Sequence, residues 1–268
     1  MRTFRNILAL GLAVVMLLCS TALADTLRVG MECNYAPFNW TQAEESEYAV
    51  PIAAGGYADG YDVRIARRVA DALGMELEIV KIEWDGLTMA LMSGKIDAII
   101  AGMSPTEERK LTIDFTDPYY ESDLVLVVRA DGPYAAASSL ADFSGARITG
   151  QLNTFHYTVI DQIPGVKKAT AMETFPAMIV ALKAGSIDGY VSELPGAVSA
   201  VASNPELTYV QFAEGEGFET STDDTAIAVA VAKGSPLRDQ INEILATISE
   251  EKREELMQWA VDNQPLSE

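Results

Sequence analysis

A glycine, a serine and an arginine stand close together directly after an apolar run, and these residue types can bind an anion. The run Ile96–Ala101 predicts a strand that Gly102 ends, and a helix with an acidic first turn is expected to begin at Ser104. The free N–H groups and positive dipole end of a helix attract anions, and the guanidinium of Arg109 adds two parallel donors. The segment therefore predicts a site for a small carboxylate. An ordinary strand-to-helix connection with a surface arginine is the alternative that the local pattern leaves open.

A second copy of this unit occurs further along the chain. Ala181–Glu193 matches Ala90–Gly102, with Ala, Leu, Gly, Ile and Asp in the same places. Two copies of one helix-strand unit predict two similar lobes, each presenting the end of a strand. Because open α/β sheets bind ligands at the carboxyl ends of their strands, Gly102 and Glu193 are expected on opposite walls of one cleft. One wall then carries the carboxylate of Glu193 and the other the guanidinium of Arg109.

Aromatic side chains follow two of the predicted strands at the same sheet edge. The strand Thr26–Met31 leads into a proline-containing loop that holds an acid and three aromatic residues: Glu32, Tyr35, Phe38 and Trp40. Trp84 follows the predicted strand Glu76–Ile82. Such a cluster predicts a wall for an apolar side chain, whereas packing within the loop explains any one of these residues taken singly.

The elements that must position these residues form two βα series. In the first series, apolar residues recur at helical spacing over Tyr61–Leu73 and Gly74 closes the helix. A strand and a helix follow. This order of elements is that of a βαβ unit and predicts a largely parallel sheet. The polar stretch 41–59 has no periodicity and is interpreted as a surface excursion or a long hairpin.

The second series is predicted beyond residue 140, after a strand at 124–129. Its strands are expected at 146–149, 167–172, 187–192 and 207–212, with helices from residues 154 and 175 and over 195–202. A last strand, 225–232, and two amphipathic helices, 237–248 and 251–261, end the chain. These helices are expected to pack back on the first lobe, which makes that lobe discontinuous and gives a hinge of two crossings.

The first residues predict a secretory signal peptide rather than part of the fold. Two arginines precede an apolar run, Ile7–Cys19, that is too short to span a bilayer. Small residues follow this run, and cleavage is expected after Ala24, so that 1–24 is the signal peptide. The alternative is a lipid anchor on Cys19, which the bulky Leu18 disfavours.

Composition argues against several classes of function. The formal net charge is −20 at pH 7, and the predicted leader holds two of the arginines, so nucleic acid would be repelled. Cleavage would leave Cys33 as the single cysteine beside a single histidine, His156. The sequence therefore predicts no internal disulfide, no metal cluster and no Cys/His dyad, and no cofactor is expected.

A set of motifs in fixed order carries a resemblance to a known family. They are YAPF, YADGYDVRIARRVADALG, EWDGL, ALMSGKIDAIIAGMSPTEERK, IDFTDPYY, LADFSGARITGQLNT and ALKAGSIDGYVSE. Together they resemble the extracytoplasmic (periplasmic) solute-binding proteins of polar amino acid ABC transporters, which include the histidine, lysine/arginine/ornithine and glutamine binding proteins. The resemblance implies an α/β, two-lobed periplasmic binding protein fold (type II), each lobe a mainly parallel sheet flanked by helices. Lobe 1 is then expected at 25–120 and 225–268, lobe 2 at 125–219, and the hinge at 121–124 and 220–224.

The resemblance also implies roles for particular residues. In that family an arginine and N–H groups of both lobes hold the ligand's α-carboxylate, while a carboxylate of the second lobe meets its α-ammonium. Arg109 and Ser104 stand at the carboxylate-binding positions, and the Gly102 carbonyl and Glu193 stand at the ammonium-binding positions. The full set implied to contact the ligand is Glu32, Tyr35, Trp84, Gly102, Met103, Ser104, Arg109, Asn153, Thr154, Phe155 and Glu193.

The ligand's side chain is expected to lie between Tyr35, Trp84 and Glu32. Glu32 occupies the place where relatives that bind cationic or amide side chains keep an acid. An acid beside two aromatic walls suits a cation or a guanidinium plane, so a ligand with a basic or amide side chain is predicted. A solvated surface glutamate is the alternative interpretation of Glu32.

Some residues near the predicted site depart from the family pattern. Glu193 stands where aspartate is more common, and its extra methylene would shift the ligand or shrink the pocket. Asn153 replaces the usual glycine, although asparagine tolerates left-handed geometry. Phe155 replaces a small polar residue whose role is a main-chain N–H. His156, in the same helical turn, is expected at the surface or beside the helix cap.

The sequence thus predicts a binding module whose lobes close on a free amino acid and deliver it to a membrane permease. The resemblance implies a monomer, located in a periplasm or held at a cell surface. An alternative is a cyclohexadienyl-dehydratase-like enzyme on the same scaffold with Glu193 as its acid, but no partner group for that acid is evident. A third possibility is an amino-acid sensor for a receptor, which the lack of a fused membrane or signalling segment disfavours.

Overall fold

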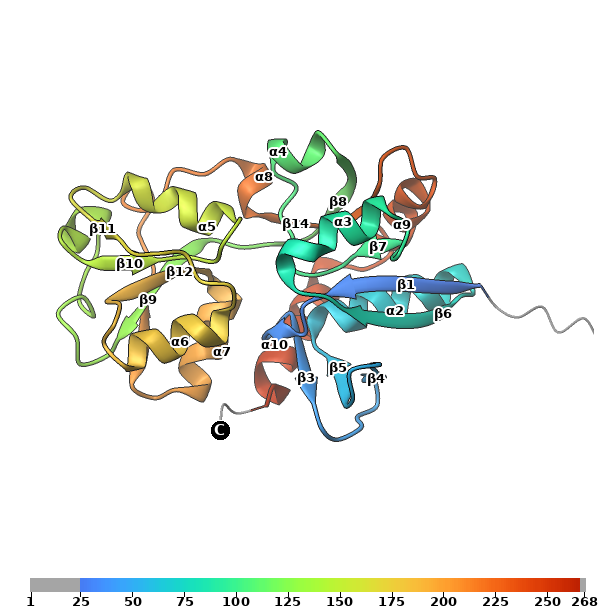
Figure 1. The fold of residues 1–268 in the computed structure, drawn as a ribbon, viewed down its shortest axis with the longest axis horizontal. Helices are drawn as coiled ribbons and strands as arrows, with labels where there is room; N and C mark the ends of the chain where they lie inside the picture. Colours follow the sequence, from blue (N-terminus) through green and yellow to red (C-terminus); the bar gives the residue numbers. More distant parts are fainter. Residues whose placement is uncertain (1–24, 266–268) are drawn as a thin grey trace, which may run out of the picture.

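The computed structural model describes residues 25–265, so the predicted signal peptide lies outside the described residues. Two lobes lie side by side, each built on a five-stranded sheet flanked by helices (Figure 1). This is the predicted two-lobed α/β architecture. Within the part of the chain that is described, no helix is long and apolar enough to cross a bilayer.

The first sheet has the strand order β6-β1-β7-β14-β8. Its parallel part consists of β6 (Glu76–Lys81), β1 (Thr26–Met31) and β7 (Ala98–Ile99). The antiparallel strand β14 (Ala226–Ala232) then joins β7 to β8 (Ile113–Glu121). Because β14 comes from the end of the chain, the first sheet is discontinuous in sequence.

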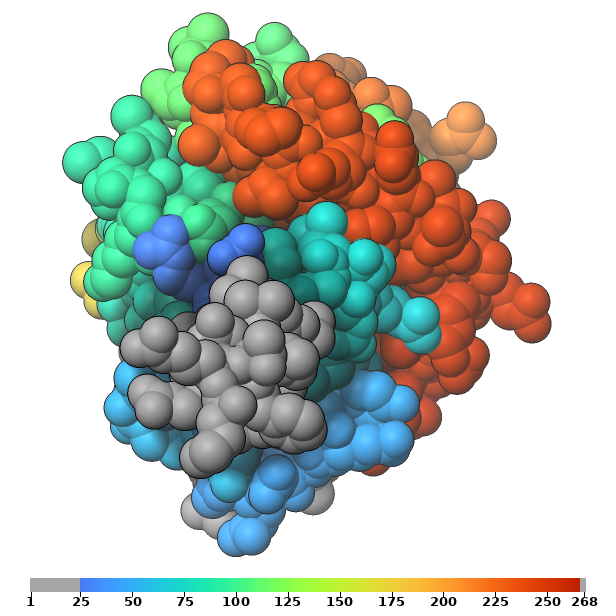
Figure 2. Space-filling model, turned by 90° about the vertical axis from the view of Figure 1, so that its right-hand side faces the viewer, coloured from blue at the N-terminus to red at the C-terminus, as the bar shows by residue number. Residues whose placement is uncertain are grey.

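Helices α2 (Tyr61–Leu73), α3 (Leu87–Met92) and α9 (Leu237–Leu245) flank the first sheet (Figure 1). Helix α2 buries its apolar stripe, including Val63, Ala66 and Val69, against the sheet, and it ends at Gly74 in the left-handed conformation. The C-terminal segment lies directly beside α2 on the face shown in Figure 2.

The second sheet has the strand order β11-β10-β12-β9-β13. Strands β11 (Lys167–Lys168), β10 (Arg147–Thr149) and β12 (Gly189–Glu193) are parallel, and β9 (Leu124–Arg129) is antiparallel to both β12 and β13 (Leu207–Val210). Helices α5 (Phe155–Thr158), α6 (Phe175–Lys183) and α7 (Leu194–Ser203) belong to this lobe. The chain enters the lobe between β8 and β9 and returns between β13 and β14, past the short helix α8 (Thr222–Thr225).

The polar stretch 41–59 is largely a small antiparallel sheet attached to the first lobe (Figure 1). Its strand order is β2-β3-β5-β4, with β2 (Asn34–Tyr35), β3 (Asn39–Gln42), β5 (Tyr57–Asp59) and β4 (Val50–Pro51). The stretch expected as a surface excursion or a long hairpin thus contributes to a four-stranded antiparallel sheet. Its first strand places Tyr35 next to the end of β1.

The repeated sequence unit folds into the same structure in both lobes. In the first lobe Arg28 donates from Nε and Nη2 to the two carboxylate oxygens of Asp97, at 2.9 and 2.7 Å. In the second lobe Arg147 makes the same fork to Asp188, at 3.0 and 2.7 Å. Each aspartate also accepts the arginine's own backbone N–H. The fork fixes where each repeated strand begins, so both strands deliver their ends to equivalent places.

Two element predictions differ from the structure. The helix expected from Ser104 is α4 (Glu107–Lys110), and its N-cap is Thr106, whose hydroxyl accepts the N–H of Arg109. Ser104 stays outside the helix because it precedes Pro105, and a residue before proline is driven towards extended geometry. The second difference concerns α10 (Glu250–Asn263), which contacts α2 in the first lobe and also α7 in the second.

Short single-turn elements complete the description. Three 3₁₀ turns lie at η1 (Trp84–Gly86), η2 (Leu140–Phe143) and η3 (Val159–Gln162). One apolar core lies between the first sheet and its helices and extends under α6 of the second lobe, and another lies under η2, η3 and the second sheet. Turn η1 sits immediately after β6 and so places Trp84 at the same sheet edge as the ends of β1 and β7.

Candidate ligand-binding site

The parallel strands of the first lobe deliver Glu32 and Gly102 to one sheet edge. Strand β1 ends just before Glu32, and the short strand β7 is followed by Gly102 with φ 62°. A Cβ at position 102 would lie 3.0 Å from the Tyr35 ring, so both the left-handed backbone and the close approach require glycine there. Tyr35 is thereby held against the backbone of the turn that Gly102 makes after β7.

The second lobe presents its own strand ends towards the first. Strand β12 ends at Glu193, and β10 leads into the loop 150–154, where Asn153 adopts the predicted left-handed conformation with φ 55°. The Asn153 side chain reaches back to the first lobe, because its Nδ2 donates to Asp85 at 2.9 Å. The two edges therefore face each other.

A narrow pocket lies between these edges. Its lining from the first lobe is Tyr35, Trp84, Gly102, Ser104 and Arg109, and its lining from the second is Gln151, Thr154, Phe155 and His156. Most of the predicted site residues are thus brought together at one place. Glu32, Asn153 and Glu193 each contact a residue of this lining, as described below.

Arg109 lies at the mouth of the pocket between the lobes. Its Nη1 donates to the Ser104 carbonyl at 2.9 Å and its Nη2 to the Asn153 carbonyl at 3.3 Å. Its guanidinium carbon stands 5.0 Å from the centre of the Trp84 ring, in cation–π range. Burial lowers the pKa of Arg109 to about 10, against the opposing charges of Glu108 and Glu193, so it remains a cation at neutral pH. An incoming carboxylate would find its fixed positive partner here.

Glu193 supplies the negative charge on the opposite wall. It is buried, its carboxylate accepts the hydroxyl of Tyr35 from the other lobe, and its Oε1 lies 2.8 Å from Nε2 of His156. Burial acts to raise the pKa of Glu193, but the charge and hydrogen bond of His156 and the bond from Tyr35 outweigh it, so the pKa lies below its ordinary value. Glu193 is therefore an ionised acceptor, suited to an ammonium group.

His156 is a buried residue of the site, although it was expected at the surface or beside the helix cap. It does lie in the first turn after the cap residue Thr154, yet it is only 4% exposed, with its ring 4.4 Å from that of Phe155 and 6.0 Å from that of Phe175. The reason is that α5 packs against β12, which turns the second residue of the helix towards Glu193. Its position within the loop already assigned to the site was the one available signal.

Glu32 lies at the other end of the cleft and is not a surface residue. It is 3% exposed, and both of its oxygens accept from Nε2 of Gln151 in the second lobe, at 3.2 and 3.3 Å. Burial raises the pKa of Glu32 to about 7, with Glu83 and Asp85 adding to the rise and Gln151 opposing it. Gln151 and the aromatic ring of Phe175, stacked 4.2 Å from Tyr35, were missed by sequence reasoning, because both meet the site only across the lobes.

The remaining predicted residues have mixed placements. Thr154 lines the pocket, and its hydroxyl donates to the Gln151 carbonyl within its own loop at 2.8 Å. The Met103 side chain instead lies in the first lobe's core, and its carbonyl accepts the N–H of Ala228 at 3.0 Å. Among the described residues no group of three histidine, cysteine, aspartate or glutamate side chains is arranged to hold a metal ion.

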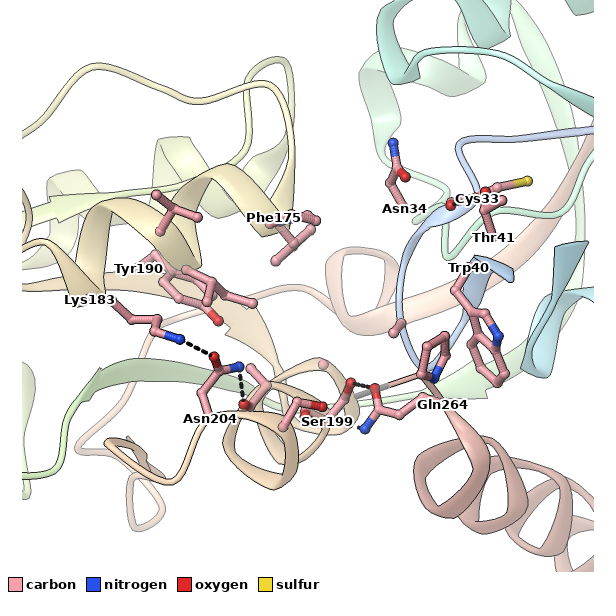
Figure 3. A pocket seen from close by; sticks show the side chains of 18 residues that line it. Cys33, Asn34, Trp40, Thr41, Phe175, Lys183, Tyr190, Ser199, Asn204 and Gln264 are labelled. Atoms are coloured by element: carbon pink, nitrogen blue, oxygen red, sulfur yellow. Dashed lines mark hydrogen bonds between the residues drawn. The ribbon is translucent and has the colours of Figure 1, made fainter. Parts of the chain in front are cut away.

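A second, wider groove also lies between the lobes (Figure 3). It is lined largely by apolar side chains such as Trp40, Phe175 and Tyr190. Polar groups in it bond to one another, as Lys183 does to Asn204 at 2.8 Å and Ser199 to Gln264 (Figure 3). Since paired charges of opposite sign converge on the smaller pocket and not on this groove, the smaller pocket is the candidate site.

Comparison with known proteins agrees with this geometry. The family model for bacterial extracellular solute-binding proteins, family 3, matches residues 27–259. A probable histidine-binding protein of Campylobacter jejuni is 33% identical over 201 residues, which cover 74% of this chain and 72% of that protein. An amino acid ABC transporter substrate-binding protein from Streptococcus pneumoniae, solved with L-arginine, has a TM-score of 0.77 at 27% identity and covers 88% of this chain and 94% of its own.

A further solved structure widens the range of bound ligands among similar proteins. An ancestral arginine-binding protein bound to glutamine has a TM-score of 0.72 at 30% identity, covering 87% of this chain and 96% of its own. The match of the family model extends over nearly all of the described residues. The chain therefore belongs to family 3 of the bacterial extracellular solute-binding proteins.

Proposed function

We propose that the protein captures a free L-amino acid with a basic or amide side chain and delivers it to the permease of an ABC importer. The observation that carries this proposal is the pairing of a fixed cation, Arg109, which lines the pocket, with a buried ionised carboxylate, Glu193, which contacts Tyr35 and His156 of the same lining. An amino acid's α-carboxylate and α-ammonium are complementary to these two charges. Similar proteins with histidine, arginine and glutamine in their descriptions support the same class of ligand.

The side-chain end of the pocket supports a basic or amide group. Glu32 and Gln151 together offer carboxylate and amide oxygens, and Trp84 offers an aromatic face. A cationic or amide side chain can donate to these oxygens while its stem packs on the ring. An apolar side chain would leave Glu32 buried with a single partner, which is costly for a polar group.

A dehydratase is the less favoured function for this site. Glu193 does have close partners, Tyr35 and His156, which the sequence did not reveal. However, a general acid needs a raised pKa, whereas these partners hold the pKa of Glu193 below its ordinary value. The geometry favours a permanent counter-ion over an acid that gives up its proton.

The proposal includes how the protein works as a carrier. Closure is assigned to hinge segments at 121–124 and 220–224, between lobe 1 (25–120 and 225–268) and lobe 2 (125–219). A monomer exported through its leader and retained in a periplasm or at a cell surface would present the closed form to the permease. Only the closed form contacts a ligand from both lobes, so binding shifts the population towards it.

A thermal-unfolding screen of the protein against the standard amino acids tests the function. A ligand at about a hundredfold its dissociation constant adds roughly 2.7 kcal/mol, which is a clear rise in melting temperature. The expected result is a strong shift with arginine, lysine, histidine or glutamine, and none for the Arg109→Ala variant with the same ligand. If no amino acid shifts the parent and prephenate or arogenate is turned over, the proposal is wrong.

A further inference from the structure

A fully buried carboxylate lies behind the candidate site. Asp62, at the second position of α2, is 0% exposed. Its Oδ1 accepts the hydroxyl of Tyr119 at 2.7 Å, and its Oδ2 accepts Nδ2 of Asn39 at 2.8 Å. Acidic side chains are seldom fully buried, because burying one has a large free-energy cost unless hydrogen bonds or a charged partner offset it. The two bonds of Asp62 offset part of this cost, and both lead towards the candidate site.

Both partners of Asp62 continue to the backbone of the site. The oxygen of Tyr119 accepts the N–H of Gly102 at 3.2 Å, and Oδ1 of Asn39 accepts the N–H of Cys33 at 2.8 Å. The Asp62 carboxylate is therefore linked through Tyr119 to the turn at Gly102 (the Gly102 corner). It is linked through Asn39 to the turn at Cys33, next to Glu32 (the Glu32 corner). Gly102 follows β7, and Cys33 stands beside Glu32 at the end of β1.

The two corners share an uncommon backbone conformation. Gly102 has φ 62° and Cys33 has φ 56°, so both are left-handed, and Cys33 is not a glycine. A left-handed conformation is unfavourable for an L-residue other than glycine, so it persists where surrounding bonds fix it. At both corners the N–H of the left-handed residue is the group that the network holds.

From this arrangement we infer that Asp62 is a positioning residue for ligand binding, acting through Tyr119 on the Gly102 corner and through Asn39 on the Glu32 corner. The inference rests on the proposed function for its account of which ligand group meets each corner. The Gly102 corner faces the ammonium end, which all amino acids share. The Glu32 corner faces the side chain, which differs among them.

The two arms of the network therefore have separable effects. Tyr119→Phe removes the acceptor of the Gly102 N–H and is expected to weaken binding of arginine, histidine and glutamine by a similar factor, about fivefold to tenfold. Asn39→Ala removes the acceptor of the Cys33 N–H and frees the corner that carries Glu32. It is expected to weaken the binding of arginine at least about fivefold more than the binding of glutamine, because a cationic side chain depends more on the Glu32 charge.

A matched control separates positioning from general loss of stability. Tyr61 neighbours Asp62 on α2 and is equally buried, and its hydroxyl donates to the main-chain carbonyl of Tyr119 at 2.9 Å. Tyr61→Phe thus removes one buried tyrosine hydroxyl without touching either corner. It is expected to lower the melting temperature as Tyr119→Phe does, while leaving the dissociation constants within about twofold of the parent.

The experiment combines calorimetric affinities with amide hydrogen exchange of the ligand-free proteins. Exchange at Gly102 is expected to accelerate in Tyr119→Phe and at Cys33 in Asn39→Ala. Asp62→Asn keeps a hydrogen-bond acceptor at only one of the two oxygen positions. It should therefore accelerate amide exchange at Gly102, at Cys33 or at both. The inference is overturned if amide exchange is unchanged at both corners. It is also overturned if Tyr119→Phe and Asn39→Ala each lower the affinity for all ligands by the same factor. Failure of the parent to bind any amino acid refutes the proposed function instead, and the exchange data still decide whether Asp62 holds the corners.

Discussion

The charge of Glu32 should decide how ligand affinity depends on pH. Burial raises the pKa of this carboxyl to about 7, against the hydrogen bond from Gln151, which lowers it, and with smaller contributions from the charges of Glu83 and Asp85, which raise it. A cationic ligand side chain needs the ionised form, so its binding must displace a proton whenever the pH lies below that pKa. A neutral amide side chain can bind beside the protonated form. The pH dependence therefore distinguishes the two ligand classes.

Arginine affinity is expected to fall about tenfold between pH 8 and pH 6, because the protonated fraction of Glu32 rises from about a tenth to about nine tenths. Glutamine affinity should change much less. Calorimetry at both pH values measures this difference. The Glu32→Gln variant should bind arginine weakly at both pH values and with no pH dependence. Glu76→Gln, at an exposed position at the start of β6, is the control that should keep the pH dependence of the parent. Parallel pH profiles for arginine and glutamine would contradict this role of Glu32.

Glu193 is expected to be the dominant contact for the ammonium group. Glu193→Gln removes the charge but keeps the side-chain length, and a lost charge-assisted hydrogen bond should cost about 1.5 to 3 kcal/mol, or about 10- to 150-fold in affinity. Glu193→Asp keeps the charge and should recover most of this loss. Titration calorimetry of both variants with one ligand makes the comparison. Equal affinities of the Gln variant and the parent would show that Glu193 serves only the Tyr35 and His156 contacts.

At the scale of elements, the repeated arginine–aspartate fork is expected to support stability and not binding. Asp97→Asn in the first lobe and Asp188→Asn in the second each weaken two side-chain bonds and one bond to a backbone N–H. Since these side chains are partly exposed, the cost should be about 1 to 2 kcal/mol. That corresponds to a fall of roughly 2 to 8 °C in melting temperature for a chain of this size.

Thermal unfolding and calorimetry of the two variants test the fork. The ligand dissociation constant should stay unchanged in both, because each fork lies at the beginning of its strand and the ligand at the end. A large loss of affinity in one lobe alone would mean that the two copies are not structurally equivalent. Similar melting shifts would support the view that one unit was used twice.

The elements that the sequence predicted well are those whose signal is local. Helix α2 follows from its apolar spacing and closing glycine, and the two lobes follow from the repeated unit. The helix start expected at Ser104 is wrong because Pro105 drives the residue before it towards extended geometry. The site roles of Gln151 and His156 had no signal beyond their place in or beside the loop 150–154, and Phe175 had none. Their roles depend on how α5 and α6 pack across the cleft, and no local pattern encodes that contact.

At the scale of the whole molecule, the site consists of contacts between lobes. Tyr35 of the first lobe bonds to Glu193 and stacks on Phe175, and Glu32 meets Gln151, so the five residues of these contacts come from both sides. Asn153 also bonds to Asp85 and Arg109 across the lobes, and α10 packs on α7. The chain itself passes between the lobes from β8 to β9 and from β13 to β14. Opening of the lobes would break the side-chain contacts between them, while the two chain crossings keep the lobes attached.

Ligand binding is therefore expected to compact the protein. Because a ligand bridging Arg109 and Glu193 favours the closed arrangement, small-angle scattering should give a smaller radius of gyration with saturating ligand than without it. Arg109→Ala at the same ligand concentration should show no such change, which separates binding from an effect of added solute. Compaction of the parent by arginine but not by alanine would tie closure to the Glu32 end of the pocket. An unchanged radius alongside binding confirmed by calorimetry would mean that the lobes are already closed before the ligand arrives.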